Sequence, residues 1–403
     1  MRRRSRRLEW LGPDLGRLLG AAALWGFAFS SFYLLPKFLI HELGAGPDDI
    51  GFVVGILGLA TVACTPLTGR WIDRAPCRHA FVAGALVMGA SALGFLAVGS
   101  VGALLGVLRV LQGASYALVV TAVGTLVSEL VPAARLGQAL GLSGASMLVM
   151  NAVAPALVEP LAAAAGWQPV FVLAAATALA SAALATRVAE PARPARDRSL
   201  PAGLLAVLRR PLGCHYAIVI ALAGAGFGAV MTFEPPYVLA LGADNVRPFF
   251  VAYAAAAIGV RLTIGHLPDR LGRRRAALGS LAAYGAAILA LAGMRPETAP
   301  LLGAVFGAAH GLFFPALNAL VVAAVPRAER GRIVAIFTGA FSLGLWAGAS
   351  LLGLVAARAG YPAVFVLAAG GVACAIAVLA ASPALKAAAA APAERRALLS
   401  PRP

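Results

Sequence analysis

GRWIDRAPCRH, at Gly69–His79, and GHLPDRLGRRR, at Gly265–Arg275, are the stretches that decide the fold of this chain. Each follows a long apolar run, and the glycines that open them lie 196 positions apart. Both keep the pattern Gly-x-x-x-Asp-Arg, although Pro76 and Cys77 make the first copy less regular than the second. A motif that recurs at equivalent points of the hydropathy pattern predicts two homologous halves with the same orientation in a membrane.

The repeat extends beyond this motif. VFVLAA occurs at Val170–Ala175 and again at Val364–Ala369, an offset of 194. At the same offset, the dipeptide at 131–132 corresponds to the one at 325–326, Val-Pro in both places. Each half holds an even number of apolar runs, so both halves begin on the same side of the membrane. Parallel halves related by an axis along the membrane normal are a known transporter arrangement.

The composition requires a membrane environment for most of the chain. Of 403 residues, 61% are hydrophobic and 12% are charged. A helix needs about 20 mostly apolar residues to cross a bilayer, and runs of this length exclude a barrel of short alternating strands. We identify twelve runs, which start near Leu18, Ile50, Ala80, Gly102, Gly137, Val170, Cys214, Phe249, Ala276, Leu301, Ile333 and Ala363. The predicted fold is an all-α membrane protein with twelve transmembrane helices in two parallel six-helix halves.

The predicted domains follow from this pattern. Residues 1–186 form the N-terminal six-helix half, and residues 213–382 form the C-terminal six-helix half. Residues 187–212 contain the only long hydrophilic segment and are expected to be a cytoplasmic linker. Residues 383–403 have low complexity, which predicts a disordered cytoplasmic tail.

The net charge of +17 reflects membrane topology. Among 33 Lys and Arg residues, four lie in one set of loops and one lies within a span, which leaves 28 in the termini and the alternate loops. This positive-inside asymmetry predicts that both termini are cytoplasmic. No nucleic-acid partner is expected, because no compact basic domain is present. The four scattered cysteines predict neither a disulfide nor a metal site.

Together, these residues resemble the major facilitator superfamily over nearly the whole chain. The resemblance rests on the twelve runs, the central linker, the repeated Gly-x-x-x-Asp-Arg motif and RVLQGASYA at Arg109–Ala117. TFEPPY, RLTIGHLPDR and FFPALNAL look like a bacterial branch of drug or sugar efflux permeases. The resemblance therefore implies the major facilitator fold and proton-coupled transport. Ala154-Pro155 stands where antiporters of the drug type often carry Gly-Pro, which counts against that type.

The repeated motif also implies a cytoplasmic gate. Asp73 and Asp269 end spans that run inward, and the resemblance places each carboxylate at the N-terminus of a neighbouring helix, where the helix dipole favours an anion. The alternative is that topology alone gathers arginines at the inner surface. Arg261, one turn before the second motif, either joins the gate or snorkels to the surface. The predicted gate residues are Gly69, Asp73, Arg74, Arg261, Gly265, Asp269, Arg270 and Gly272.

Arg109 is the intramembrane charge of the fourth span. At a rise of about 1.5 Å per residue it lies about 10 Å below the outer end of that span, where an ion usually faces a cavity or a partner. Spacings of three, four and seven put Gln112, Gly113 and Tyr116 on its helical face. The resemblance implies that Arg109 couples proton binding to substrate movement. The alternative is a structural arginine held by backbone carbonyls.

Proton coupling also needs a group that can lose a proton, and an arginine cannot. Glu234 is one candidate, near the outer end of the seventh span, where Pro235 and Pro236 are expected to break the helix. The alternative is an exposed glutamate at the membrane boundary. His310 in the tenth span is another candidate, and its alternative is a satisfied packing histidine. Glu129 and Glu159, at ends of the fourth and fifth spans, are further carboxylates of this kind.

The resemblance implies a substrate cavity lined by the first, fourth, seventh and tenth spans, with polar support from the fifth. Flat aromatic rings suit adaptable apolar binding, although the same rings are ordinary in membrane packing. The predicted cavity residues are Phe29, Phe32, Tyr33, Gln112, Tyr116, Asn151, Phe314 and Asn318.

The expected function is that of a secondary active transporter in a bacterial inner membrane, exporting a small organic molecule in exchange for protons by alternating access. The alternative is proton-linked or facilitated uptake of a small nutrient such as a sugar or organic acid. A membrane-embedded enzyme or receptor is a remote alternative, because the acidic residues and histidines are dispersed. No phosphate-binding loop occurs in the sequence. We expect no enzymatic activity and no cofactor, and we expect a monomer.

Overall fold

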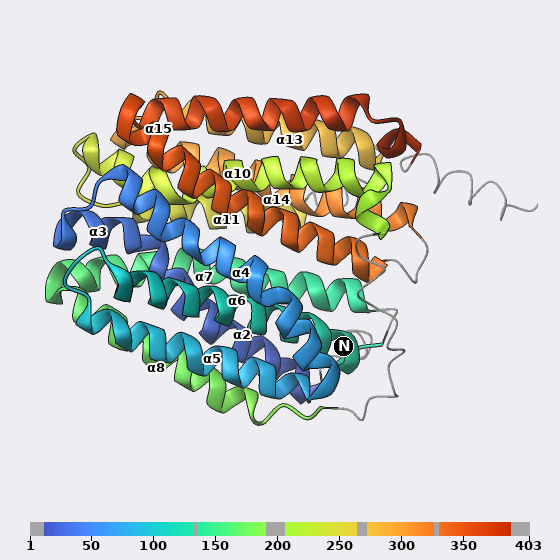
Figure 1. The fold of residues 1–403 in the computed structure, drawn as a ribbon, viewed down its shortest axis with the longest axis horizontal. Helices are drawn as coiled ribbons and strands as arrows, with labels where there is room; N and C mark the ends of the chain where they lie inside the picture. Colours follow the sequence, from blue (N-terminus) through green and yellow to red (C-terminus); the bar gives the residue numbers. More distant parts are fainter. Residues whose placement is uncertain (1–11, 133–134, 191–205, 264–271, 326–329, 388–403) are drawn as a thin grey trace, which may run out of the picture. The chain divides into compact units, whose positions relative to one another are not determined.

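The computed structural model describes residues 12–132, 135–190, 206–263, 272–325 and 330–387. Nearly all of these residues are helical (Figure 1). The chain divides into two compact units. Unit 1 comprises Met1–Arg196 and Asp244–Val251, and unit 2 comprises Asp197–Ala243 and Ala252–Pro403. The predicted all-α fold is confirmed, whereas the predicted boundaries of the halves and the linker stay predictions.

Unit 1 is built from consecutive helices of the N-terminal part of the chain. They are α2 (Pro13–Ser31), η1 (Phe32–Leu34), α3 (Leu35–Leu43), α4 (Pro47–Arg74), α5 (Cys77–Gly94), η2 (Phe95–Ala97), α6 (Ala103–Leu130), α7 (Leu136–Ala165) and α8 (Trp167–Ala185). The first residues of α11 (Arg247–Thr263) also belong to unit 1.

Unit 2 holds the helices of the C-terminal part. Besides the rest of α11, they are α10 (Pro211–Ala240), α13 (Arg273–Leu291), η3 (Pro296–Thr298), α14 (Ala299–Ala324) and α15 (Arg330–Ala381). Gly360 has a non-helical backbone inside α15, so this element consists of two helices joined at that residue.

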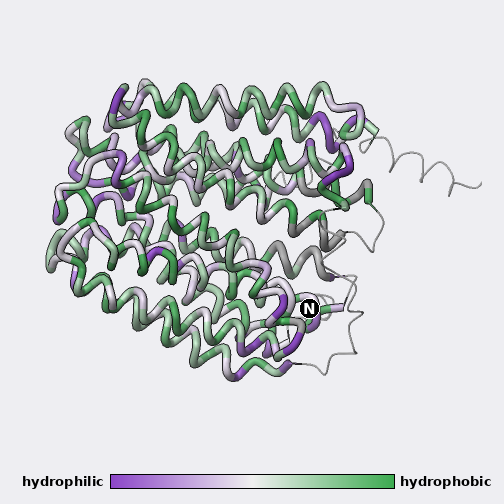
Figure 2. The backbone as a smooth tube through the Cα atoms, viewed as in Figure 1, coloured by the Kyte–Doolittle hydropathy of each residue, from purple (hydrophilic) through white to green (hydrophobic). Residues whose placement is uncertain are grey.

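The described helices account for all twelve predicted runs. Nine candidate spans among the described helices are long and apolar enough to cross a membrane by length and composition. The span in α15 includes both helices of that element, so it accounts for two of the predicted runs. The two other runs correspond to α11, which has 17 residues, and to α13, which opens on three arginines. Each predicted start lies within five residues of the observed helix start. Hydrophobic residues run along the helices, and hydrophilic residues gather mainly near their ends (Figure 2).

Two glycines at equivalent repeat positions separate neighbouring helices. Gly166 lies between α7 and α8 with φ 78° and ψ −176°, and Gly360 divides α15 with φ 78° and ψ 169°. A side chain is strongly disfavoured in this region of backbone space. The two positions are 194 residues apart, the offset of the VFVLAA repeat that follows each of them.

Glycine also permits close helix packing at equivalent places in the two units. In unit 1, a Cβ atom at Gly113 of α6 would collide with Leu57 O of α4. In unit 2, a Cβ atom at Gly307 of α14 would collide with Tyr253 O of α11. Such small residues let helix backbones approach each other in a membrane.

The beginning of the predicted disordered tail is ordered. Residues 383–387 are helical, and Leu385 is buried. Ser382 Oγ accepts a hydrogen bond from Leu385 N at 3.2 Å, and it also lies 2.8 Å from His215 Nδ1 of α10. Serine at this position caps a helix, and Pro383 suits the first helical residue. The prediction of disorder was therefore wrong for 383–387; residues 388–403 lie outside the described part.

Candidate functional site

Arg109 is buried between α6 and α4 of unit 1, with 3% of its surface exposed. Its Nε donates to Val53 O at 3.1 Å, and its Nη2 donates to Val54 O at 3.1 Å. Its Nη1 donates to Gln112 Oε1. All three acceptors are neutral oxygens, so the buried cation is stabilised by dipoles. This is the geometry of the structural alternative, and a role in coupling stays a prediction.

The other residues on the predicted helical face of Arg109 make contacts in two different places. Gln112 is fully buried and accepts the Arg109 hydrogen bond, while its Nε2 makes no hydrogen bond among the described residues. Gly113 lies against the α4 backbone. The ring of Tyr116 turns instead to α2, where its centroid lies 5.0 Å from that of Phe29. The face therefore connects the arginine to an aromatic group.

That aromatic group, here called the α2 cluster, consists of Trp25, Phe29 and Tyr33 of α2 and η1 with Tyr116 of α6. Phe29 lies 5.2 Å from Trp25 and 6.1 Å from Tyr33, measured between ring centroids. On the same helix α2, Ser30 Oγ donates to Asn151 Oδ1 of α7 at 2.8 Å. The structure therefore brings Phe29, Tyr33, Tyr116 and Asn151 to one region of unit 1. Aromatic rings with a polar border can receive a small organic molecule.

Phe32 does not belong to the α2 cluster, and its predicted place in the cavity stays a prediction. Its ring packs 4.8 Å from Phe95 and 6.1 Å from Phe171 in the core of unit 1. The reason is local: α2 ends at Ser31 and Phe32 begins a 3₁₀ turn. Since 3₁₀ and α-helices differ in residues per turn, the α-helical spacing does not carry through this point.

In unit 2, His310 and Phe314 of α14 lie among aromatic side chains. His310 Nδ1 lies 2.9 Å from the Tyr253 hydroxyl, and the Phe227 ring centroid is 4.9 Å from that of His310. Phe314 packs edge-on at 4.4 Å from Phe337. His310 Nε2 is buried without a hydrogen bond among the described residues. The side chain of Asn318 lies outside the described part.

Glu234 is 0% exposed in α10, so the alternative of an exposed boundary glutamate is wrong. The expected helix break is also wrong, because α10 continues through Pro235 and Pro236 to Ala240. Proline removes a backbone donor, but transmembrane helices tolerate the loss where neighbouring groups compensate.

The predicted cytoplasmic gate is only partly described. Gly69 and Arg74 lie in the last turns of α4, and Arg74 is exposed. Gly272 precedes α13 with φ 87°. Arg261 Nε donates to Gly311 O of α14 at 3.4 Å. Gly265, Asp269 and Arg270, and the side chain of Asp73, lie outside the described residues, so the gate stays a prediction.

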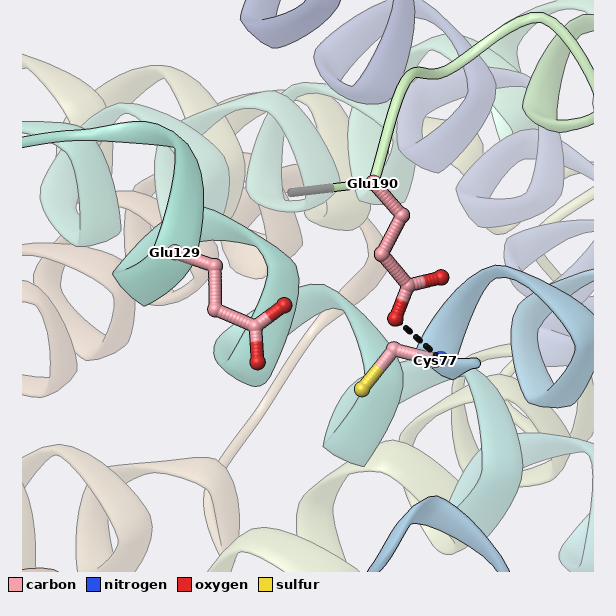
Figure 3. A group of neighbouring side chains, drawn as sticks. All are labelled: Cys77, Glu129 and Glu190. Carbon is pink, nitrogen blue, oxygen red and sulfur yellow. Dashed lines mark hydrogen bonds between the residues drawn. The ribbon is translucent and has the colours of Figure 1, made fainter. Parts of the chain in front are cut away.

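Glu190, a residue that the sequence did not single out, occupies a helix N-terminus of the kind predicted for Asp73. Its Oε1 accepts from Cys77 N at 2.6 Å and its Oε2 accepts from Arg78 N at 3.0 Å, at the start of α5. Figure 3 shows Cys77 and Glu129 beside it, and the three residues offer ligand atoms within 4.8 Å of one another. Because both Glu190 oxygens already accept N–H bonds, the arrangement favours a helix cap over a metal centre.

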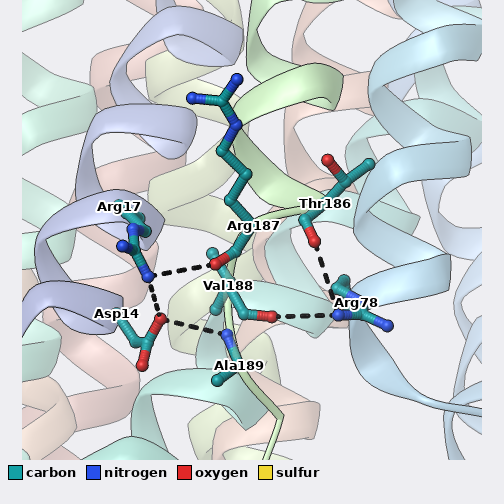
Figure 4. A network of polar contacts seen from close by, with 7 residues as sticks. All are labelled: Asp14, Arg17, Arg78, Thr186, Arg187, Val188 and Ala189. Carbon is teal, nitrogen blue, oxygen red and sulfur yellow. Dashed lines mark hydrogen bonds and ion pairs between the residues drawn. The ribbon is translucent and has the colours of Figure 1, made fainter.

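A second group of contacts fixes the chain just after α8 (Figure 4). Asp14 Oδ1 accepts from Ala189 N at 3.1 Å and pairs with Arg17 at 2.9 Å. Arg78 Nη1 donates to Val188 O at 3.3 Å. These bonds hold the first residues of the predicted linker against α2 and α5.

A model of the Major Facilitator Superfamily matches residues 18–267 and 248–402. The chain belongs to this family. It is 34% identical over 163 residues to a protein of Escherichia coli (strain K12) described as the uncharacterized MFS-type transporter YhhS. It is 32% identical over 165 residues to the protein of the same description in Salmonella typhimurium. These matches cover 40% of the chain and only 40% of the length of the curated relatives.

Solved structures of two transporters share the fold of this chain. A D-xylose-proton symporter aligns with a TM-score of 0.77 at 16% identity, covering 93% of this chain and 98% of the symporter. The nucleoside transporter NupG aligns with a TM-score of 0.74 at 16% identity, covering 92% and 99%. At such identity, the likeness concerns the fold alone.

Proposed function

We propose that this protein is a secondary active transporter that exports a small organic molecule in exchange for protons. It works in the inner membrane of a bacterium, with both termini cytoplasmic, and exposes its substrate site alternately to the two sides. The observation that carries this proposal is Arg109, a charge buried inside a helical bundle of this family and connected through α6 to the α2 cluster. A buried intramembrane charge is costly and marks a functional site by default.

Two buried groups support proton coupling. Glu234 of α10 and His310 of α14 are both able to exchange a proton, whereas Arg109 is not. We assign Arg109 the role of a fixed charge and assign proton exchange to Glu234 or His310. The α2 cluster with Asn151 provides apolar and polar contacts for the transported molecule.

Uptake of a nutrient is the second candidate. A D-xylose-proton symporter and a nucleoside transporter share the fold, and the molecules in both names are polar metabolites. The Ser30–Asn151 hydrogen bond at 2.8 Å offers the kind of polar contact that such molecules need. In this case the same residues bind the nutrient, and the proton moves in the same direction as the substrate.

Purified protein in proteoliposomes tests both candidates. A panel of compounds is first screened for thermal stabilisation, because a ligand stabilises the state that binds it. Uptake of each binder is then followed with an imposed pH gradient of either sign. Export by exchange predicts accumulation towards the acidic side, and symport predicts accumulation away from it. Substrate movement that is indifferent to the gradient would contradict proton coupling in both forms.

A further inference from the structure

Glu159 of α7 is a buried carboxylate with no part in the proposed proton route. It is 4% exposed. Its Oε1 accepts from Lys37 Nζ of α3 at 2.6 Å and from Val246 N at 2.9 Å. Its Oε2 accepts from Arg247 N at 2.8 Å and from Val246 N at 3.1 Å. One side chain thus joins three segments that are far apart in the sequence.

The two backbone donors belong to the start of α11. The first N–H groups of a helix have no partner within the helix, and the helix dipole favours an anion beside them. Glu159 supplies that anion. Lys37 Nζ also donates to Asp244 O at 3.0 Å, so the lysine holds the residues just before the helix while the carboxylate holds its first turn.

The segment held in this way has an unusual place in the chain. Residues Asp244–Val251 belong to unit 1, although the residues before and after them belong to unit 2. Within the segment, Phe250 stacks on Tyr33 of the α2 cluster, with ring centroids 5.8 Å apart and planes 7° apart. Helix α11 therefore has its first turns in unit 1 and the rest of its length in unit 2.

We propose that Glu159 and Lys37 form a latch that holds the first turn of α11 to unit 1, and that the latch must open in each transport cycle. This inference rests on the proposed transport function. A buried charged group that loses its partners is strongly destabilised, so the latch holds firmly when closed. The Lys37 side chain is 15% exposed, compared with 5% for Glu159, so water reaches the cation first when the pair separates.

Distance measurement between two spin labels tests the latch directly. The four native cysteines are replaced, and labels are attached at Asp48→Cys and Arg247→Cys, whose side chains are exposed in α4 and α11. In the protein that keeps Glu159, we expect one dominant short distance between the two labels, which marks the latched state. In Glu159→Gln, the ratio of latched to released molecules should fall about thirtyfold, as expected when one partner of a buried charged pair is lost. An unchanged distance distribution overturns the proposal.

Three comparison variants separate the latch from a general effect of charge or folding. Glu42→Gln removes the same charge from an exposed site on α3 and should change nothing. Glu159→Asp keeps a carboxylate and should retain most of the latched population. Lys37→Met loses the cation but leaves the helix capped, so it should shift the ratio less than Glu159→Gln; a larger shift contradicts the assignment of the helix cap to Glu159.

A charge exchange isolates the contribution of the helix N-terminus. In the double variant Lys37→Glu with Glu159→Lys, the two charges still attract, but an ammonium group cannot accept hydrogen bonds from Val246 N and Arg247 N. The exchanged pair should therefore stay released. Full recovery of the short distance would mean that ion pairing alone holds the segment, and the latch as proposed would be wrong.

Transport assays distinguish failure of the latch from failure of the proposed function. Glu159→Gln should lower the maximal rate about tenfold with little change in KM, because the variant alters a conformational equilibrium rather than the substrate site. Suppose that transport by the wild-type protein does not depend on the pH gradient, while Glu159→Gln still increases the distance between the labels. The latch is then supported and proton coupling is contradicted. If wild-type transport is proton-coupled while the labels do not move, the latch falls alone.

Discussion

The α4–α6 contact of unit 1 and the α11–α14 contact of unit 2 share one packing arrangement but carry different polar groups. Gly113 and Gly307 are 194 residues apart, and each lies against a backbone carbonyl of the neighbouring helix. The residues that supply those carbonyls, Leu57 and Tyr253, are 196 residues apart. The close backbone approach is therefore duplicated almost residue for residue.

The charges are not duplicated. In unit 1 the arginine stands on α6 and makes two 3.1 Å bonds to α4 carbonyls. In unit 2 the equivalent of Arg109 is a glycine, and Arg261 stands on the opposite helix, α11, with one 3.4 Å bond to α14. His310 takes the place of Tyr116 at the offset of 194. The two units therefore share a packing frame, and the residues by which they differ are the ones to test for function.

Neutralising the two arginines should give the largest difference in transport between the two units. Arg109→Met removes several charge-assisted hydrogen bonds worth about 3 kcal/mol together, so transport should fall about a hundredfold. Among the contacts that the structure describes, Arg261→Met removes one long bond from a half-buried group, and it should lower transport less than about fivefold. Initial rates in proteoliposomes measure both effects, with Arg109→Lys as the variant that keeps the charge but not the three-acceptor geometry. Equal losses in the two units would contradict the asymmetry.

Adding a methyl group at the two packing glycines tests the shared frame. Gly113→Ala and Gly307→Ala should each lower the free energy of unfolding by about 3 kcal/mol, because the new Cβ meets a backbone carbonyl that cannot move aside. Gly124→Ala, in the same helix as Gly113, meets nothing within 4 Å and should be neutral or stabilising. Thermal unfolding in detergent gives the comparison. Tolerance at one glycine and not the other would show that the two contacts differ.

The two helix-joining glycines should respond alike. Gly166→Ala and Gly360→Ala each force a side chain into backbone angles that favour glycine, at a cost of about 2 kcal/mol. Gly370→Ala, within the second helix of α15 and with nothing within 4 Å, is the matched control. The shifts in Tm report the cost. An unchanged Tm in Gly360→Ala alone would mean that the connection between the two helices of α15 does not need glycine.

Tyr253→Phe should have the smallest effect. It removes the hydroxyl that lies 2.9 Å from His310 Nδ1, which costs about 1 kcal/mol of stability. If His310 carries the proton, the dependence of transport on pH should shift in this variant, whereas a packing histidine would leave that dependence unchanged. Tyr284→Phe, which loses a hydroxyl bond to Ala223 O in the same unit, is the control for stability alone.

The helices and their order were predictable from sequence because long apolar runs and the repeated motif depend on local composition. The twelve runs and the face shared by Arg109 and Gln112 are of this kind. The α-helical period does not carry through Phe32, where a 3₁₀ turn begins, and α10 continues through the prolines at 235 and 236.

The contacts made by Glu159 and Glu190 could not be predicted from spacing. Each carboxylate reaches the N-terminus of a helix about 90 to 110 residues away in the chain. The sequence marks Glu159 as one of several carboxylate candidates for proton coupling, but its partners come from α3 and α11. Only the folded arrangement shows which N–H groups a given carboxylate accepts.

The residues just after α8 are held by side chains of two different helices. Asp14 of α2 binds Ala189 N, and Arg78 of α5 binds Val188 O. Removal of either side chain leaves the segment attached to one helix instead of two. Local opening of Val188 and Ala189 then breaks fewer contacts, so their amide hydrogens should exchange with solvent faster.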